Sequence, residues 1–224
     1  MKTILFDLDG VLFDIHSTLE NCIKDVNPLF SMERVVTYDF NGSVSYDDLP
    51  DWIRITDAFP NEKQTYRGLN ADYNTIYTWL KDVELFERSK YIDNAFLMLT
   101  YLTKYYKVVV HTLAYSYDIA NFKSSTFFES LVDEKASGDI SFICTVGDFK
   151  ESLVYADYVV EDCIENCLEY KNIGVENFLL IDKPYNSSQF YEKSLAELPK
   201  LQRFSSTYKA FDYLVKMARA NDYT

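Results

Sequence analysis

Several ingredients that membrane, zinc and secreted proteins need are missing from this sequence. Its 224 residues contain no run of 18 or more apolar residues, so we expect no membrane-spanning segment. The only two histidines are His16 and His111, so few histidine ligands are present for a zinc site. The four scattered cysteines are expected to be reduced thiols. The first residues, Met1 to Asp7, do not have the pattern of a secretory signal, and we therefore expect a cytoplasmic protein.

Positive charge is also in short supply. The chain has 22 Lys and Arg against 35 Asp and Glu, a formal net charge of −13. Broad affinity for nucleic-acid backbones or anionic membranes needs a positive face, so we expect neither a polynucleotide nor a membrane as a partner. A phosphorylated small molecule stays open as a ligand if a metal ion supplies local positive charge. The oligomeric state is left open, and a homodimer is one arrangement that the sequence allows.

What the chain does have is an apolar content of 48%, arranged as strand-like runs that alternate with helical patterns. The five runs are apolar without polar alternation, which is typical of parallel strands buried on both faces. They cover Thr3–Phe6, Val108–His111, Ser141–Val146, Tyr158–Val160 and Asn177–Ile181. We predict an α/β fold, a doubly wound parallel five-stranded sheet with a Rossmann-like core.

The interval between the first two predicted strands is far longer than a crossover needs, about a hundred residues. Ser17 begins a capping box, and two amphipathic helical patterns lie within the interval. We predict an α/β core formed by residues 1–14 and 89–224, with a mostly helical cap, residues 15–88, inserted after the first strand. Because open α/β sheets bind ligands at the carboxyl ends of their strands, such a cap would cover the site as a lid.

Two carboxylates come directly after the first strand, at Asp7 and Asp9, and Gly10 is next. If the backbone stays extended, side chains two residues apart point the same way. Such a pair needs a cation, and Mg²⁺ with oxygen ligands fits. The alternative is a cluster of helix N-caps, in which Asp9 or Asp14 caps the segment after it.

Polar side chains also end three further strands. Thr112 ends the second, Lys150 comes after the third, and Glu161 and Asp162 end the fourth. Each has a simpler explanation: a cap for Thr112, a solvated surface position for Lys150, and favourable charge at a helix N-terminus for Glu161 and Asp162. Taken together, they indicate one site at the carboxyl edge of the sheet.

The Asp-x-Asp-Gly motif and this order of residues resemble the haloacid dehalogenase-like phosphatase superfamily across essentially the whole chain. The resemblance implies a phosphoric monoester hydrolase in which Asp7 is the nucleophile that becomes an aspartyl-phosphate. Asp9 would be the general acid and then the general base. The implied cofactor is Mg²⁺, bound by Asp7, the backbone carbonyl of Asp9, and Asp162.

The same resemblance implies that Thr112, Leu113 and Lys150 bind the phosphate. Glu161 stands where the family usually has a second Asp. We therefore expect Glu161 and Asn166 to support the metal ligands without binding the metal themselves. Leu113 replaces a more usual small residue, which could alter the floor of the pocket.

Several short sequence segments further resemble the 5'(3')-deoxyribonucleotidase family, including its phage and bacterial members. These are Asp7 to Leu12, Lys150 ahead of Ala156–Asp162, and Asp182 to Asn186, with Arg203 near the family's terminal arginine. The resemblance implies a nucleoside monophosphate substrate whose base stacks on aromatic residues near the site. The candidates for that stacking are Phe13, Phe40, Trp52 and Tyr73.

Two other functions remain open on the sequence alone. The first is a phosphatase for another small phosphorylated metabolite, acting by the same mechanism. The second is a catalytically silent homologue that only binds a nucleotide. The base, the sugar and the 5' or 3' position of the phosphate are not determined by the sequence.

Overall fold

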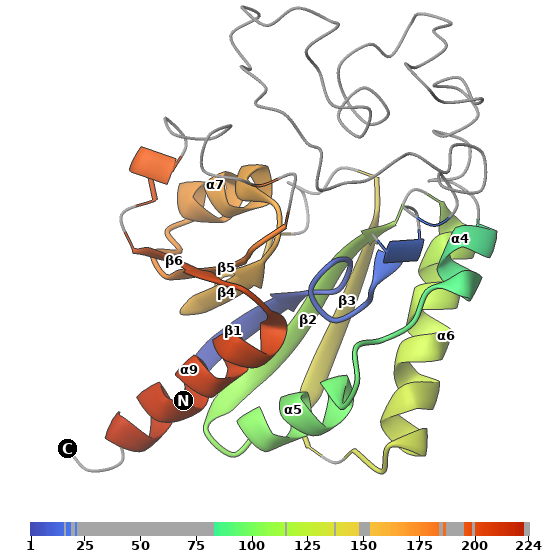
Figure 1. The fold of residues 1–224 in the computed structure, drawn as a ribbon, viewed down its shortest axis with the longest axis horizontal. Coiled ribbons are helices and arrows are strands. Elements are labelled where there is room, and N and C mark those ends of the chain that lie inside the picture. The colour runs from blue at the N-terminus through green and yellow to red at the C-terminus, as the bar shows by residue number, and fades with distance from the viewer. Residues whose placement is uncertain are drawn as a thin grey trace, which may run out of the picture.

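The computed structural model describes residues 1–15, 17–18, 21, 83–114, 116–136, 138–147, 153–183, 186, 195–198 and 200–221. Strands and helices alternate along most of this part of the chain (Figure 1). In chain order they are β1 (Lys2–Asp7), α4 (Val83–Arg88), α5 (Ala95–Leu102), β2 (Tyr106–Ala114), α6 (Tyr117–Asp133), β3 (Ile140–Val146), β4 (Tyr158–Glu161), α7 (Ile164–Asn172), β5 (Phe178–Ile181), β6 (Leu201–Phe204) and α9 (Thr207–Asn221).

The strands form one sheet in the order β3-β2-β1-β4-β5-β6, and every neighbouring pair is parallel. This confirms the predicted doubly wound α/β fold. Within the described residues the sheet has six strands rather than the predicted five, because β6 was not anticipated. β6 is a four-residue edge strand, and its Gln202 and Arg203 interrupt the apolar pattern by which the other strands were found.

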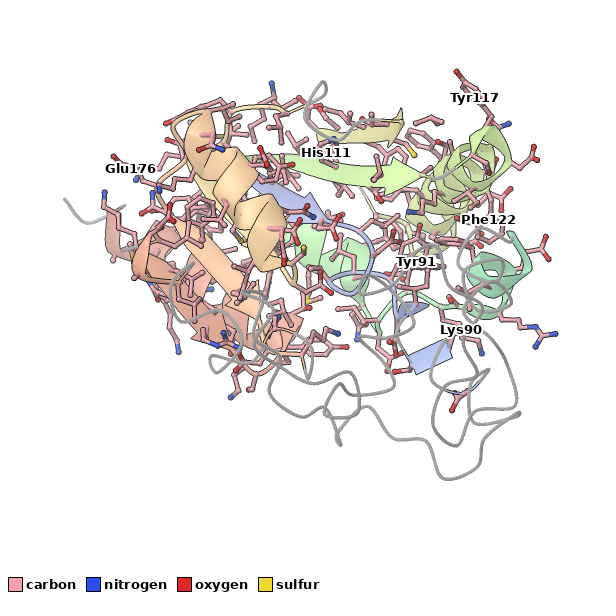
Figure 2. All side chains as sticks on the ribbon, turned by 90° about the horizontal axis from the view of Figure 1, so that it is seen from above. Lys90, Tyr91, His111, Tyr117, Phe122 and Glu176 are labelled. Atoms are coloured by element: carbon pink, nitrogen blue, oxygen red, sulfur yellow. The ribbon has the colours of Figure 1, made fainter. Side chains whose placement is uncertain are left out.

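Alternating side chains of β1 enter two separate cores. Ile4 and Phe6 join a cluster that includes residues of α4, α5, α6 and α9, whereas Leu5 joins a cluster that includes residues of α7. Helices therefore cover both faces of the sheet, as Figure 1 shows. The same alternation turns His111 of β2 toward α7, where Nδ1 meets the hydroxyl of Tyr170, and Figure 2 shows His111 on the sheet, seen from above.

The loop after β1 is tightly closed. Gly10 has a φ of +76°, a left-handed conformation that glycine adopts without steric cost. Its amide donates to the carbonyl of Phe13 at 2.8 Å, and the amide of Phe13 donates to the carbonyl of Leu8 at 2.8 Å. At the start of α9, the Thr207 hydroxyl donates to the carbonyl of Val11 at 2.7 Å. The backbone that carries Asp9 is thus fixed from both sides.

The longest helix of the described part, α6, was not anticipated from the sequence. It has 17 residues, and the side chain of its N-cap, Ser116, accepts the amide of Ile119. Only Ile119, Lys123 and Phe127 are buried along it, so its apolar stripe is thin and has a lysine in the middle.

Most of the predicted cap, residues 22–82, lies outside the described residues. Within the predicted cap range, α4 packs against α6, and its Leu85 and Phe86 belong to the larger core cluster. Among the described helices, none combines the length and the apolarity that crossing a membrane requires.

Candidate functional site

The carboxyl ends of β1 and β4 bring three acidic side chains together. Asp7 is the last residue of β1, and Glu161 and Asp162 stand at the end of β4, the next strand in the sheet. One carboxylate oxygen from each of these residues lies within 4.8 Å of the other two. All three side chains are buried or nearly so, with exposed fractions of 9%, 1% and 4%.

Three buried carboxylates at this spacing repel one another strongly. Burial raises the pKa of Asp7 well above its usual range, and the negative charges of Glu161 and Asp162 raise it further. Burial, followed by the charge of Asp162, raises the pKa of Glu161 to about 8. A hard divalent cation with oxygen ligands would relieve this repulsion, so the donor set fits Mg²⁺.

Glu161 shapes the loop after β4. Its Oε2 accepts the backbone amides of Asp162 at 2.8 Å and Cys163 at 2.9 Å, and its Oε1 accepts the side-chain amide of Asn166 at 2.7 Å. With both oxygens engaged in this way, Glu161 fixes the loop that presents Asp162. Asp7 and Asp162 are then the carboxylates that could hold the cation most directly.

A second group lies on the α6 side of the sheet and is centred on Lys123. Its ammonium group forms an ion pair with Asp9 Oδ2 and donates to Thr112 Oγ1 at 3.0 Å and to the carbonyl of Leu113 at 2.6 Å. Lys123 is 1% exposed and Thr112 is fully buried. Sequence reasoning missed Lys123, although one signal existed, since Ile119, Lys123 and Phe127 fall at the i, i+4, i+8 spacing of a buried helix face.

A third group joins the loop after β5 to the loop after β4. The side-chain amide of Asn186, which is 1% exposed, donates to the carbonyls of Asp162 and Ile181, both at 2.7 Å. Its oxygen accepts the amide of Lys183 at 3.0 Å and Nη2 of Arg203 at 2.9 Å. Both side-chain donors and the acceptor of Asn186 are therefore used, and the segment that carries Asp162 is tied to β5 and β6.

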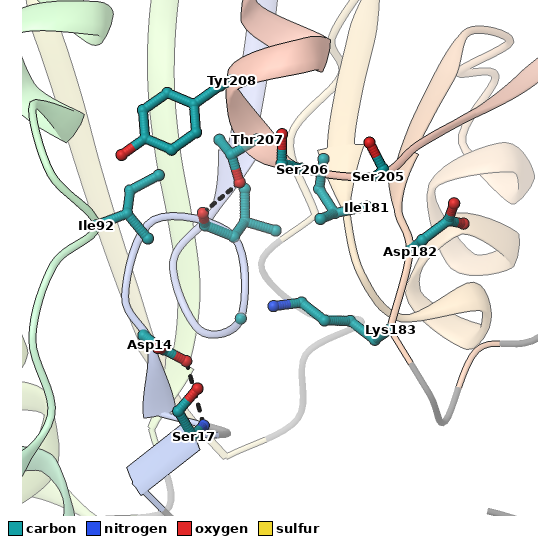
Figure 3. A pocket seen from close by; sticks show the side chains of 12 residues that line it. Asp14, Ser17, Ile92, Ile181, Asp182, Lys183, Ser205, Ser206, Thr207 and Tyr208 are labelled. Carbon is teal, nitrogen blue, oxygen red and sulfur yellow. Dashed lines mark hydrogen bonds between the residues drawn. The ribbon is translucent and has the colours of Figure 1, made fainter. Parts of the chain in front are cut away.

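A cavity of about 210 Å³ opens beside the loop after β1 (Figure 3). Gly10 and Asp14 line one side, and residues that come after β5 and β6 line the other. Lys183 extends toward the middle of this space, opposite Asp14 (Figure 3). Ser205 and Ser206 add hydroxyl groups to its wall.

The other predicted site residues divide into two groups. Lys150, Phe40, Trp52 and Tyr73 lie outside the described residues. Phe13 is a core residue with 3% exposure, and its ring meets the Tyr91 ring edge-on at a centroid distance of 4.8 Å. Phe13 therefore offers almost no surface on which a base could stack, which corrects its assignment as a substrate contact.

No protein-family model matches the chain, and neither does any curated protein. Among solved structures, it is similar to a haloacid dehalogenase-like family hydrolase from Streptococcus pneumoniae, with 14% sequence identity and a TM-score of 0.42. The match covers 95% of this chain and 98% of that one. At this level of likeness, what the site can do has to be argued from its own residues.

Proposed function

We propose that this chain is a Mg²⁺-dependent phosphatase that releases inorganic phosphate from nucleoside monophosphates through an aspartyl-phosphate intermediate. One observation carries the proposal. Asp7 belongs to a carboxylate cluster suited to a hard cation, and two residues further on a second carboxylate, Asp9, is held together with Thr112 by Lys123. A nucleophile, a cation site and an acid/base group are what hydrolysis of a phosphate ester by a carboxylate needs.

In the first step, an oxygen of Asp7 forms a bond to phosphorus as the bond from phosphorus to the ester oxygen breaks. Asp9 gives its proton to the departing alkoxide, which leaves as a neutral alcohol. In the second step, Asp9 takes a proton from water as the water oxygen attacks phosphorus. Asp7 is then released as a carboxylate, together with inorganic phosphate.

Asp7, Asp162 and the backbone carbonyl of Asp9 would hold Mg²⁺. When bound, the ion offsets the negative charge of the phosphoryl group and of the attacking carboxylate. The Thr112 hydroxyl would donate to a phosphoryl oxygen. Lys150 and Leu113 remain proposed phosphate contacts, Lys150 on the strength of the sequence resemblance alone.

A nucleoside monophosphate is the substrate class that the resemblance to the 5'(3')-deoxyribonucleotidase family favours. The cavity beside Gly10 adds support, because Lys183, Ser205 and Ser206 offer polar contacts to a sugar at the same edge of the sheet. The net charge of −13 weighs against a polynucleotide. We further propose that the protein acts in the cytoplasm.

The direct test is phosphate release from a panel of 5' and 3' nucleoside monophosphates and sugar phosphates, with Mg²⁺ and with a chelator. Asp7→Asn should reduce release to the background, whereas Asp133→Asn, an exposed aspartate at the end of α6, should leave it unchanged. Release from sugar phosphates alone would keep the mechanism and overturn the nucleotide substrate. Nucleotide binding without any release would point to the silent homologue.

A further inference from the structure

Lys123 is a charged residue in a place where charge needs a specific reason. It lies on the buried face of α6, between Ile119 and Phe127, and is 1% exposed. Its ammonium nitrogen stands 4.9 Å from the centroid of the Phe86 ring, on α4. Burying an ammonium ion is costly unless it is paired and hydrogen-bonded, so its partners indicate what it does.

The hydrogen-bonding capacity of Lys123 is fully used. An ammonium group has three N–H donors, and three acceptors surround this one: Asp9 Oδ2, Thr112 Oγ1 and the Leu113 carbonyl. No donor is left over for a phosphoryl oxygen. The geometry therefore differs from that of a lysine that binds the phosphate directly.

The bond to Asp9 distinguishes its two carboxylate oxygens. Oδ2 is held by Lys123, whereas Oδ1 is buried and has no hydrogen-bond partner among the described residues. A buried carboxylate oxygen without a partner is unusual in a folded protein. Of the two oxygens, Oδ1 is therefore the one that no described residue engages.

The bond to Thr112 orients a hydroxyl group in a similar way. Because Thr112 Oγ1 accepts from Lys123 at 3.0 Å, its own hydrogen has to point away from the ammonium group. The alternative acceptor, the Leu113 carbonyl, lies at 3.4 Å and is already bound by Lys123 at 2.6 Å. The Thr112 hydroxyl therefore donates only over this long distance, and a closer anionic ligand could take its hydrogen instead.

We propose that Lys123 is a positioning residue, which fixes Asp9 so that Oδ1 is the acid/base oxygen and orients the Thr112 hydroxyl toward the phosphoryl group. This inference rests on the proposed phosphatase function and deepens it. During the reaction Oδ2 stays an acceptor of Lys123, while Oδ1 gives its proton to the leaving alkoxide and regains one from water. Lys123 acts through Asp9 and Thr112 and does not itself touch the reacting atoms.

A comparison of leaving groups tests this role. An alkyl phosphate such as a nucleoside monophosphate needs its departing oxygen protonated, whereas p-nitrophenyl phosphate has a leaving group that departs without a proton. For Lys123→Met we expect kcat/KM to fall about 10²–10³-fold on the nucleotide. On p-nitrophenyl phosphate we expect kcat/KM to fall about tenfold or less. Nitrophenolate should appear in a burst, because the first step no longer needs a proton from Asp9 whereas attack by water in the second step still does. Equal losses on both substrates would identify a phosphate-binding lysine and overturn the proposal.

A second set of variants keeps the test meaningful if Lys123→Met folds poorly. Lys123→Gln keeps a hydrogen-bond donor, and Lys209→Met removes an exposed helical lysine as a matched control. Because Asp9→Asn keeps the contribution that Lys123 makes through Thr112, adding Lys123→Met to it should cost no more than the loss of about tenfold or less expected on p-nitrophenyl phosphate. The double variant should also unfold at a higher temperature than Lys123→Met, since it lacks the uncompensated carboxylate. Independent, multiplicative losses would contradict the inference.

The wild type separates the two proposals within the same experiment. If it releases phosphate from neither substrate with Mg²⁺, the proposed function fails and this inference fails with it. If it is active and the Lys123 variants show the same losses on both leaving groups, the phosphatase stands and only the role of Lys123 is overturned.

Discussion

The side-chain amide of Asn186 donates to the backbone carbonyl of Asp162 at 2.7 Å. This bond crosses from the loop after β5 to the loop after β4, over 24 residues of sequence. Because Asn186 also accepts from Arg203, whose Nε donates to Asp182 at 2.7 Å, the proposed metal ligand is linked to the edge strand β6. The last two strands of the sheet thereby help to place Asp162.

Asn186→Ala should weaken metal binding more than catalysis. It removes the donor that holds the Asp162 carbonyl, and the loss of such supporting bonds typically lowers metal affinity 10- to 100-fold. We expect the Mg²⁺ concentration for half-maximal phosphate release to rise by about that factor, while kcat at saturating Mg²⁺ changes far less. Stability should also fall, by about 1–3 kcal/mol, because buried carbonyls lose their partner.

Asn177→Ala is the matched control for this variant. Its side-chain amide donates to the carbonyl of Asp157 at 2.9 Å, a similar bond at the amino ends of β4 and β5, away from the site. It should lower stability without changing the Mg²⁺ requirement. An unchanged Mg²⁺ requirement in Asn186→Ala as well would show that the bond to Asp162 has no part in metal binding.

Gly10→Ala should impair activity and stability together. Gly10 has a φ of +76°, and a left-handed backbone costs a residue with a Cβ roughly 1–2 kcal/mol. Relaxing that strain would move the neighbouring Asp9, so we expect kcat to fall along with the melting temperature. Phosphate release and thermal unfolding measure the two effects.

Gly174→Ala provides the comparison, because Gly174 comes after α7 with a φ of +94° and an added Cβ would meet no atom within 4 Å. A similar loss of stability is expected there, with activity intact. If both variants lost activity to the same small extent, the conformation of Gly10 would matter for folding alone.

Much of the architecture could be predicted from the sequence because the central strands are apolar and short. The strands that end at Asp7 and Glu161 were found within about one residue of their observed ends, since both are buried on the two faces of the sheet. Parallel strands end at a common edge, so their order in the chain was enough to group Asp7, Glu161 and Asp162. The structure places these three together, as expected.

Other parts of the site depend on contacts that strand pattern does not encode. Lys123 comes from a helix whose apolar stripe is thin, and its importance lies in a three-dimensional pairing with Asp9. Asn186 was noted only as the last residue of the segment from Asp182 to Asn186. Its bonds to Asp162 and Ile181 depend on how two loops meet. Short polar contacts between distant segments have no periodicity for a sequence pattern to detect.

The acidic cluster predicts an unusual dependence of stability on pH. The pKa of Asp7 is raised well above 3.8, and that of Glu161 is raised from 4.5 to about 8. A carboxyl group with a raised pKa contributes stability below its unfolded pKa and loses that contribution as the pH rises through the folded value. Without metal, the melting temperature should therefore fall between about pH 6.5 and pH 8. His111, whose pKa is lowered to about 4 by burial, acts in the opposite direction and mainly below about pH 6.5.

Mg²⁺ should reverse this loss, and more so at the higher pH. Its ligands have to be deprotonated, so binding competes with protons and strengthens as the pH rises. We expect millimolar Mg²⁺ to raise the melting temperature more at pH 8 than at pH 6.5, as measured by thermal unfolding with and without a chelator. Asp7→Asn should be more stable than the wild type without metal at pH 8, and should gain little from Mg²⁺. Asp133→Asn should behave as the wild type does. An equal gain from Mg²⁺ in Asp7→Asn would mean that the cation binds elsewhere, because the proposed site needs the Asp7 carboxylate as a ligand.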